Sequence, residues 1–234
     1  MLIKLTCSGK CKRNVKLIYI ETRKISERSN VASKSSEKPL EKQPYHHGDL
    51  RAALMTAALK LIDQHGVKGF TLKDAARMAG VSIAAPYRHF ADKEALLLAI
   101  QDEGFAAFDA ALAASRNPAL TPKEQFIELG VAYVRFALGH PAHIRVMFGM
   151  TVSASPEPKQ SHHGEIGYAL LVESVAALDP GAPQDLQHDL VVASWSIVHG
   201  YALLQLDGAL AASGSTGDPE TQLRRALARL LANN

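Results

Sequence analysis

Apolar residues recur at helical spacing through most of the chain that follows position 49. Leu50, Leu54, Ala57 and Leu61 are separated by four, three and four residues, which places them on one face of a helix. The same periodicity predicts further helices over 122–138, 142–150, 165–178, 185–210 and 219–232. Because no segment shows the alternation of a strand, we expect an all-α fold.

The segment 71–90, TLKDAARMAGVSIAAPYRHF, has the pattern of two short helices joined by a glycine turn. Thr71 is followed three residues later by Asp74, a capping-box spacing that opens the first helix. Ser82 is expected to cap the second helix, over 83–90. This is the pattern of a helix-turn-helix, whose second helix is free to enter the major groove of DNA.

Charge is distributed unevenly along the chain. Residues 1–44 hold 11 Lys and Arg against 4 Asp and Glu (net +7), residues 45–100 hold 7 against 5 (net +2), and residues 101–234 hold 8 against 14 (net −6). A basic N-terminal part favours binding to a polyanion, although a solvated basic tail would have the same composition. We expect 1–44 to be a mostly disordered basic arm; translation that begins nearer Tyr45 is the alternative.

Several function classes lack their signatures. Cys7 and Cys11 have no second ligand pair for zinc, and this cysteine usage fits a reducing cytoplasm. No apolar run is long enough to span a membrane, and neither a G-x-S-x-G elbow nor a phosphate loop is present. We therefore expect a cytoplasmic protein that is not an enzyme and holds no cofactor and no metal. A metal sensor is the alternative, prompted by the ten histidines, among them His46-His47, His140 and His143, and His162-His163.

The stretch from about 48 to 108 resembles the TetR/AcrR family of bacterial regulators. The matching pieces are A-A-L-x-L-I-x-x-x-G-x-x-x-x-T over 57–71, A-G-V-S over 79–82, Y-x-H-F over 87–90 and D-K-E-x-L-L over 92–97. Pro86 departs from the pattern, because the family more often has an aliphatic residue there. The resemblance implies a helix-turn-helix DNA-binding domain over 45–108 and a ligand-binding and dimerisation domain over 109–234. It also implies a homodimer that binds a two-fold operator on double-stranded DNA as a ligand-responsive repressor; an activator on the same scaffold is the alternative.

Contacts with DNA are carried over by the same resemblance, residue by residue. Phosphate contacts are expected from Thr71, Lys73, Tyr87, His89 and Lys93. Ser82, Ala84, Ala85 and Arg88 are expected to face the groove. Arg88 is the candidate for base reading, because a guanidinium can bridge O6 and N7 of guanine; a surface charge or a phosphate contact is the alternative.

The predicted helix over 185–210 is apolar on two faces, so it needs cover on both sides. The protomer's own core can cover one face and a second subunit the other, although a wholly intramolecular helix is the alternative. With the last helix, it supplies the expected dimer interface: Leu190, Ile197, Gly200, Leu204, Leu223, Leu227 and Leu230.

Trp195, His199 and Gly200 resemble the W-x-x-x-H-G signature of a TetR C-terminal subfamily, over about 120–210. We expect a pocket there for a small-molecule effector of unknown identity, with mostly apolar walls and a few polar groups. Its candidate lining is Phe105, Phe108, Phe126, Tyr133, Phe136, His140, Met147, Phe148, Tyr168, Trp195, His199 and Gln205. Ordinary core packing is the alternative for most of these, whereas His199 and Gln205 are favoured because polar groups inside a core need partners.

Overall fold

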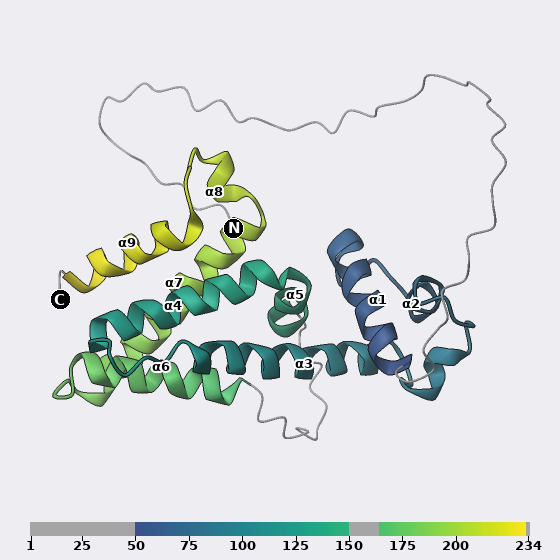
Figure 1. Cartoon of the computed structure of the whole chain (residues 1–234), viewed down its shortest axis with the longest axis horizontal. Coiled ribbons are helices and arrows are strands. Elements are labelled where there is room, and N and C mark those ends of the chain that lie inside the picture. The colour runs from purple at the N-terminus through teal and green to yellow at the C-terminus, as the bar shows by residue number, and fades with distance from the viewer. Residues whose placement is uncertain (1–49, 150–163, 233–234) are drawn as a thin grey trace, which may run out of the picture. The chain divides into compact units, whose positions relative to one another are not determined.

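A computed structural model describes residues 50–149 and 164–232, and every regular element within these ranges is helical (Figure 1). The expected all-α fold is confirmed. The predictions for the arm 1–44, the two cysteines, residues 45–49 and the pair His162-His163 lie outside the described residues.

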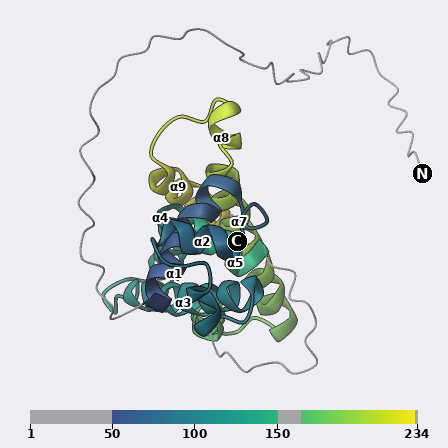
Figure 2. The same cartoon turned by 90° about the vertical axis from the view of Figure 1, so that its right-hand side faces the viewer.

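Four elements make up the first half of the described chain: α1 (Leu50–His65), α2 (Leu72–Met78), the short 3₁₀ helix η1 (Ala85–Arg88) and α3 (Lys93–Ala114). The second half holds α4 (Pro122–Gly139), α5 (Pro141–Gly149), α6 (Glu165–Leu178), α7 (Gln184–Leu206), α8 (Ala209–Ala212) and α9 (Pro219–Ala232). The helix expected over 185–210 is divided at Gly208, whose φ of +69° is a left-handed conformation that glycine adopts without strain. Figures 1 and 2 both show α8 projecting beyond the neighbouring helices, and none of its residues is buried.

Reciprocal capping boxes fix where two of these helices begin. Thr71 Oγ1 accepts from the amide of Asp74 at 3.3 Å, and the Asp74 carboxylate accepts from the amide of Thr71 at 2.9 Å. Thr121 makes the same reciprocal box with Glu124 at the start of α4. Each box satisfies backbone N–H groups that have no partner within the helix, so both starts follow from local sequence.

The α-helix expected over 83–90 is wrong: the structure has only η1, which spans Ala85–Arg88. Pro86 has no N–H and cannot donate to the carbonyl of Ser82, as an α-helix would require. Instead, the amide of Ala85 donates to that carbonyl at 3.0 Å, which is 3₁₀ spacing. Ser82 thus contributes its backbone carbonyl rather than a side-chain cap.

The buried residues form two cores. Leu54, Ile62 and Leu96 belong to the first, with partners from α1, α2, α3 and α5. The second lies among α3, α4, α5, α6, α7 and α9, and includes Phe108 and Val134. Helix α3 enters both, so the domain boundary expected after residue 108 falls inside one continuous helix.

Helix α9 packs on α4 through apolar contacts and two ion pairs. Arg135 Nε lies 2.8 Å from Glu220 Oε1, and Arg224 pairs with Glu128 through Nη1 and Nη2, its two terminal guanidinium nitrogens. Between the pairs, a Cβ on Gly130 would lie 2.9 Å from a methyl carbon of Leu227, so this glycine admits the close approach of α9. None of the described helices is long and apolar enough to cross a membrane.

Candidate nucleic-acid interface and ligand cavity

Helix α2 and η1 form the two arms of the candidate DNA-binding motif. Ala75 and Ala76 are fully buried on α2, where small side chains allow close packing. The chain turns at Gly80, whose φ is +72°, and the amide of Val81 donates back to the carbonyl of Ala76 at 3.0 Å. This turn holds η1 against α2, with Pro86 buried and with Tyr87 and Arg88 exposed.

Most residues expected to contact DNA are exposed on this motif. The exposed members are Thr71, Lys73, Ser82, Ala84, Tyr87, Arg88 and His89. Ala85 and Lys93 are half-buried. Tyr87 is 53% exposed, whereas Phe90, at the end of the motif, is buried in the first core.

Two of these residues already have partners within the chain. Thr71 Oγ1 donates to Asp74 Oδ2 at 2.6 Å as part of the cap. Lys93 Nζ donates to the carbonyl of Phe70 at 2.7 Å and lies 4.2 Å from the centre of its ring. Burial lowers the pKa of Lys93, but an ammonium has three donors, and one bond to Phe70 leaves two for a phosphate.

Sequence reasoning missed Ile83, an exposed large apolar side chain at the leading edge of the motif. It precedes η1, between Ser82 and Ala84, which are also exposed. Beside Ala84, it offers an apolar surface of the kind that contacts thymine methyl groups.

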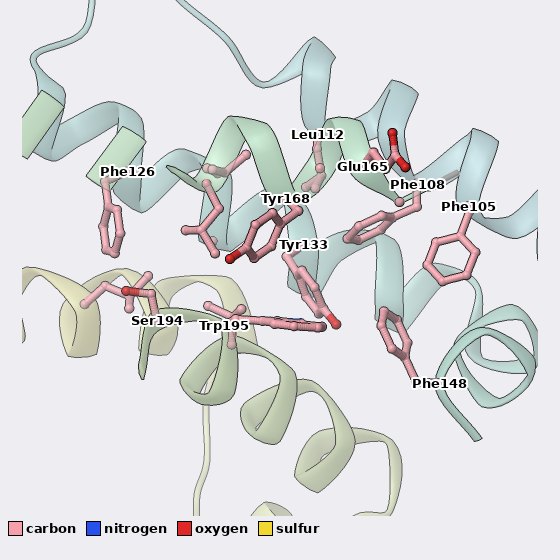
Figure 3. A pocket seen from close by; sticks show the side chains of 17 residues that line it. Phe105, Phe108, Leu112, Phe126, Tyr133, Phe148, Glu165, Tyr168, Ser194 and Trp195 are labelled. Carbon is pink, nitrogen blue, oxygen red and sulfur yellow. The ribbon is translucent and has the colours of Figure 1, made fainter. Parts of the chain in front are cut away.

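A cavity of about 480 Å³ lies in the second core. Its walls come mainly from α3, α4, α6 and α7, with single residues from α5 and α9. Seven aromatic side chains line it: Phe105, Phe108, Phe126, Tyr133, Phe148, Tyr168 and Trp195 (Figure 3). All seven belong to the set expected from the sequence.

Five other residues of that set do not line the cavity. Phe136 and His140 stack on each other, with ring centres 4.4 Å apart. Met147 packs toward Gly104, where a Cβ would lie 2.9 Å from its sulfur. Gln205 Nε2 donates to the Tyr201 hydroxyl at 3.0 Å, so its polar group is satisfied near the start of α9 rather than in the cavity.

The fifth, His199, lies directly behind the cavity wall. Its Nδ1 is 2.7 Å from the hydroxyl oxygen of Tyr133, which does line the cavity. Burial lowers the pKa of His199, and it raises the pKa of Tyr133; the indole N–H of Trp195 opposes the rise at Tyr133. Trp195 and His199 are one turn apart on α7, so the W-x-x-x-H spacing brings both to a single tyrosine hydroxyl.

Asp109 is a buried carboxylate that sequence reasoning did not identify. Its two oxygens accept from the amides of Gly164 and Gly167 at 3.0 and 2.9 Å, which fixes the start of α6 beside the cavity. An acidic residue within an apolar stretch of α3 was the available signal. Its partners lie 55 and 58 residues away, too far for local reasoning.

One face of α7 packs inside the protomer and the opposite face is uncovered. Ile197 and Leu204 on α7 are 40% and 46% exposed, and Leu230 on α9 is 50% exposed. A Cβ on Gly200 would meet no atom within 4 Å, and Leu190 is half-buried against the core.

The structure contradicts two residues of the expected dimer interface. Leu223 and Leu227 are 1% and 2% exposed, because α9 turns both toward α4 and the second core. They stabilise the protomer and are not accessible to a second subunit.

The described part of the chain contains no group of three or more His, Cys, Asp or Glu residues that could hold a metal ion. His143 faces Glu103 across 3.6 Å, and burial lowers the pKa of His143. His140, the C-cap of α4, stacks on Phe136, and His143 of α5 lies beside Glu103, so both histidines take part in helix packing in this structure.

Comparison with known proteins addresses the two halves separately. Residues 54–100 match the family described as "Bacterial regulatory proteins, tetR family", and residues 126–230 match the family described as "Tetracyclin repressor-like, C-terminal domain". The chain belongs to the TetR family. It is therefore a DNA-binding transcriptional regulator rather than an enzyme. The W-x-x-x-H-G subfamily stays a prediction.

One curated regulator matches part of the chain, and two solved structures share its fold. The chain is 48% identical over 48 residues to the HTH-type transcriptional regulator BetI of Agrobacterium fabrum, a match that spans 20% of this chain and 23% of that regulator. A solved protein of unknown function from Rhodococcus sp. RHA1 is 31% identical, with a TM-score of 0.67, over 82% of this chain and 98% of that one. A tetR-family regulatory protein from Rhodococcus RHA1 shares the fold, with a TM-score of 0.62 at 22% identity over 78% of this chain and 95% of that one.

Proposed function

We propose that this TetR-family chain is a cytoplasmic, ligand-responsive repressor that binds a two-fold operator as a homodimer. The observation that carries the proposal is the position of α5. Phe148 of α5 lines the cavity, whereas Ala142 and Val146 of the same short helix are buried in the core of the DNA-binding half. A ligand that displaces Phe148 therefore acts on a helix that packs directly against the DNA-binding half.

Polar contacts attach α5 to its neighbours as well. Arg145 pairs with Asp63 of α1 at 3.2 Å. Gln101 of α3 donates through Nε2 to the carbonyl of Met147 at 3.2 Å. Because α5 contacts both α1 and α3, a shift of α5 would change the position of the α2–η1 motif that packs on these helices.

The energy required for regulation is modest. A ligand shifts a two-state equilibrium only by the difference between its affinities for the two states. A tenfold fall in operator affinity needs about 1.4 kcal/mol. Loss or gain of the contacts of one buried aromatic ring is of this order.

The uncovered apolar face of α7 supports the homodimer. Ile197, Leu204 and Leu230 expose large apolar side chains, and Gly200 leaves room for another helix to approach. A two-fold dimer presents two recognition elements to half-sites about 34–36 Å apart, one turn of DNA. In this arrangement the exposed face of η1, with Arg88, reads one half-site in each protomer.

Selection of DNA from a random duplex library tests the proposal and does not require a known operator. Immobilised full-length protein is expected to enrich an inverted repeat, and sedimentation of the complex is expected to give two chains per duplex. Enrichment of nothing above the starting library at moderate salt would contradict sequence-specific binding. Enrichment of one asymmetric half-site, bound by one chain, would contradict the homodimer.

A further inference from the structure

We infer that the cavity takes an uncharged, ring-containing molecule whose hydroxyl group donates to the Tyr133 hydroxyl oxygen. The inference rests on the proposed function, which requires an effector in this cavity but leaves its chemistry open. Four properties of the described wall lead to it: its volume, its aromatic rings, its charge and its hydrogen-bonding groups.

The volume and the rings favour a compact cyclic molecule. About 480 Å³ lies within the range of about 300–1,000 Å³ that is typical of small-molecule sites. The lining rings meet edge to face: Phe108 and Tyr133 have ring centres 5.1 Å apart at 86°, and Tyr168 and Trp195 have centres 6.3 Å apart at 68°. A ligand ring can extend these edge-to-face contacts, which are favourable beyond the area that they bury.

The wall offers no compensation for an anion. Among the described lining residues there is no Lys, Arg or His, so a bound carboxylate or phosphate would lose its hydration without a cationic partner. A cation would meet aromatic faces, but Glu165 is the one acidic residue of the described lining. Figure 3 shows the Glu165 carboxylate directed away from Tyr133, Tyr168 and Trp195. A bound cation would also lose its hydration, so an uncharged molecule avoids the desolvation penalty of either ion.

Tyr133 supplies the polar contact inside the cavity. Burial lowers the pKa of His199 and favours its neutral ring, so the Nδ1 atom, 2.7 Å from the Tyr133 hydroxyl oxygen, can accept a hydrogen bond from that hydroxyl. The indole N–H of Trp195 approaches the same oxygen and can only donate. A phenolic oxygen has two acceptor positions, so one remains for a donor on the ligand.

The other hydroxyls of the wall are less suited to this role. Ser194 Oγ donates to the carbonyl of Leu190 at 2.5 Å, within its own helix. Tyr168 is exposed, so water competes for its hydroxyl. Tyr133 is buried, and a hydrogen bond there is not exposed to this competition.

Calorimetric titration of the full chain with four naphthalene probes tests the inference at pH 7. β-Naphthol is uncharged and carries a donor, its methyl ether lacks the donor, β-naphthoate is an anion, and the β-naphthyl trimethylammonium ion is a cation. We expect β-naphthol to bind most tightly, the ether about 5- to 10-fold more weakly, and both ions at least 100-fold more weakly. Tighter binding of either ion would overturn the uncharged class.

The Tyr133→Phe variant tests the hydroxyl, because it keeps the ring. Affinity for β-naphthol is expected to fall about 5- to 10-fold, while affinity for the ether changes less than twofold. The matched control is Tyr201→Phe, which removes a hydroxyl bonded to the carbonyl of Pro219 at 2.9 Å, outside the cavity; neither probe's affinity should change. An equal loss for naphthol and ether in Tyr133→Phe would overturn the hydroxyl contact.

Failure of the inference and failure of the proposed function give different results. If no naphthalene probe binds while the same preparation still binds its selected duplex, the ligand class is wrong and the DNA-binding function stands. If β-naphthol binds as expected but no duplex is selected, the ligand class stands and the proposed operator binding fails.

Discussion

The DNA-binding half and the cavity-bearing half of the described chain leave different chemistry uncovered. On the α2–η1 motif the exposed groups include the polar side chains of Lys73, Tyr87 and Arg88, which suit a phosphate backbone and base edges. On α7 and α9 they include Ile197, Leu204 and Leu230, which suit another apolar surface. We therefore expect substitutions in the first half to alter DNA binding alone, and substitutions in the second half to alter assembly or ligand binding.

The largest effect is expected where α9 is buried. Leu223→Ala should destabilise the protomer by about 2–5 kcal/mol, because it removes a side chain that is 1% exposed and leaves a cavity. Thermal unfolding at two protein concentrations measures this. Leu230→Ala on the same helix is the matched control and should chiefly change the concentration dependence of unfolding. Equal, concentration-independent losses in the two variants would contradict the division of α9 into a buried and an interface side.

Subunit association should be the next most sensitive property. A carboxylate at Ile197 or Leu204 (Ile197→Asp, Leu204→Asp) should weaken dimerisation at least 100-fold, since the charge would be buried without a partner. Sedimentation velocity measures it. Leu98→Asp on α3 adds the same group at a similarly exposed leucine, and this variant should remain dimeric. If both α7 variants remain dimeric, the dimer interface does not lie on this face of α7.

On the DNA-binding half, Arg88→Ala should weaken binding to the selected duplex by about 10- to 100-fold and relax the choice of base at one position in each half-site. Fluorescence anisotropy on the selected duplex and on single-base variants measures both effects. Arg225→Ala, which removes an exposed arginine of α9, should leave DNA affinity unchanged. A uniform loss across all duplexes would instead assign Arg88 to a phosphate.

The smallest effect is expected at the ion pairs between α4 and α9. Glu128→Gln should cost about 1 kcal/mol or less, because the pair with Arg224 is partly exposed. The hydrogen bond from Arg224 lowers the pKa of Glu128, so its contribution is present above the ordinary carboxyl pKa and disappears as the pH falls through the lowered value. Denaturant unfolding at neutral and acidic pH should show the difference between wild type and variant shrinking in acid. A difference that grows in acid would contradict this sign.

Local sequence signals led to a correct prediction where both interacting residues lie within one turn of a helix. The cap formed by Thr71 and Asp74 is found as expected, because its partners are three residues apart. The prediction of an α-helix over 83–90 was wrong. Pro86 has no N–H to donate to the carbonyl of Ser82, four residues earlier, and the structure has a 3₁₀ turn there instead. The spacing of apolar residues carries no information about a missing backbone N–H group.

The cavity was predictable in composition but not in detail. Its seven aromatic residues were expected because ligand cavities have mostly apolar walls, and all seven line the cavity. The preference for His199 and Gln205 as lining residues was wrong, because each is satisfied by a tyrosine hydroxyl: Tyr133 for His199 and Tyr201 for Gln205. The pairing of Tyr133 with His199 depends on how α4 packs on α7. The spacing of residues along one helix does not predict such a contact.

Leu223 and Leu227 illustrate the same limit on α9. The repeat of leucines predicts one apolar face, and it does not tell whether α4 or a second subunit covers that face. Gly130, 97 residues before Leu227, decides it by admitting α9 against α4.

The most direct test of the central claim, that filling the cavity changes DNA affinity through α5, is an anisotropy titration of the selected duplex with and without saturating β-naphthol. We predict at least a fivefold fall in affinity, the lower end of typical coupling between two sites. An unchanged affinity, while calorimetry shows the probe bound to the same preparation, would contradict the claim.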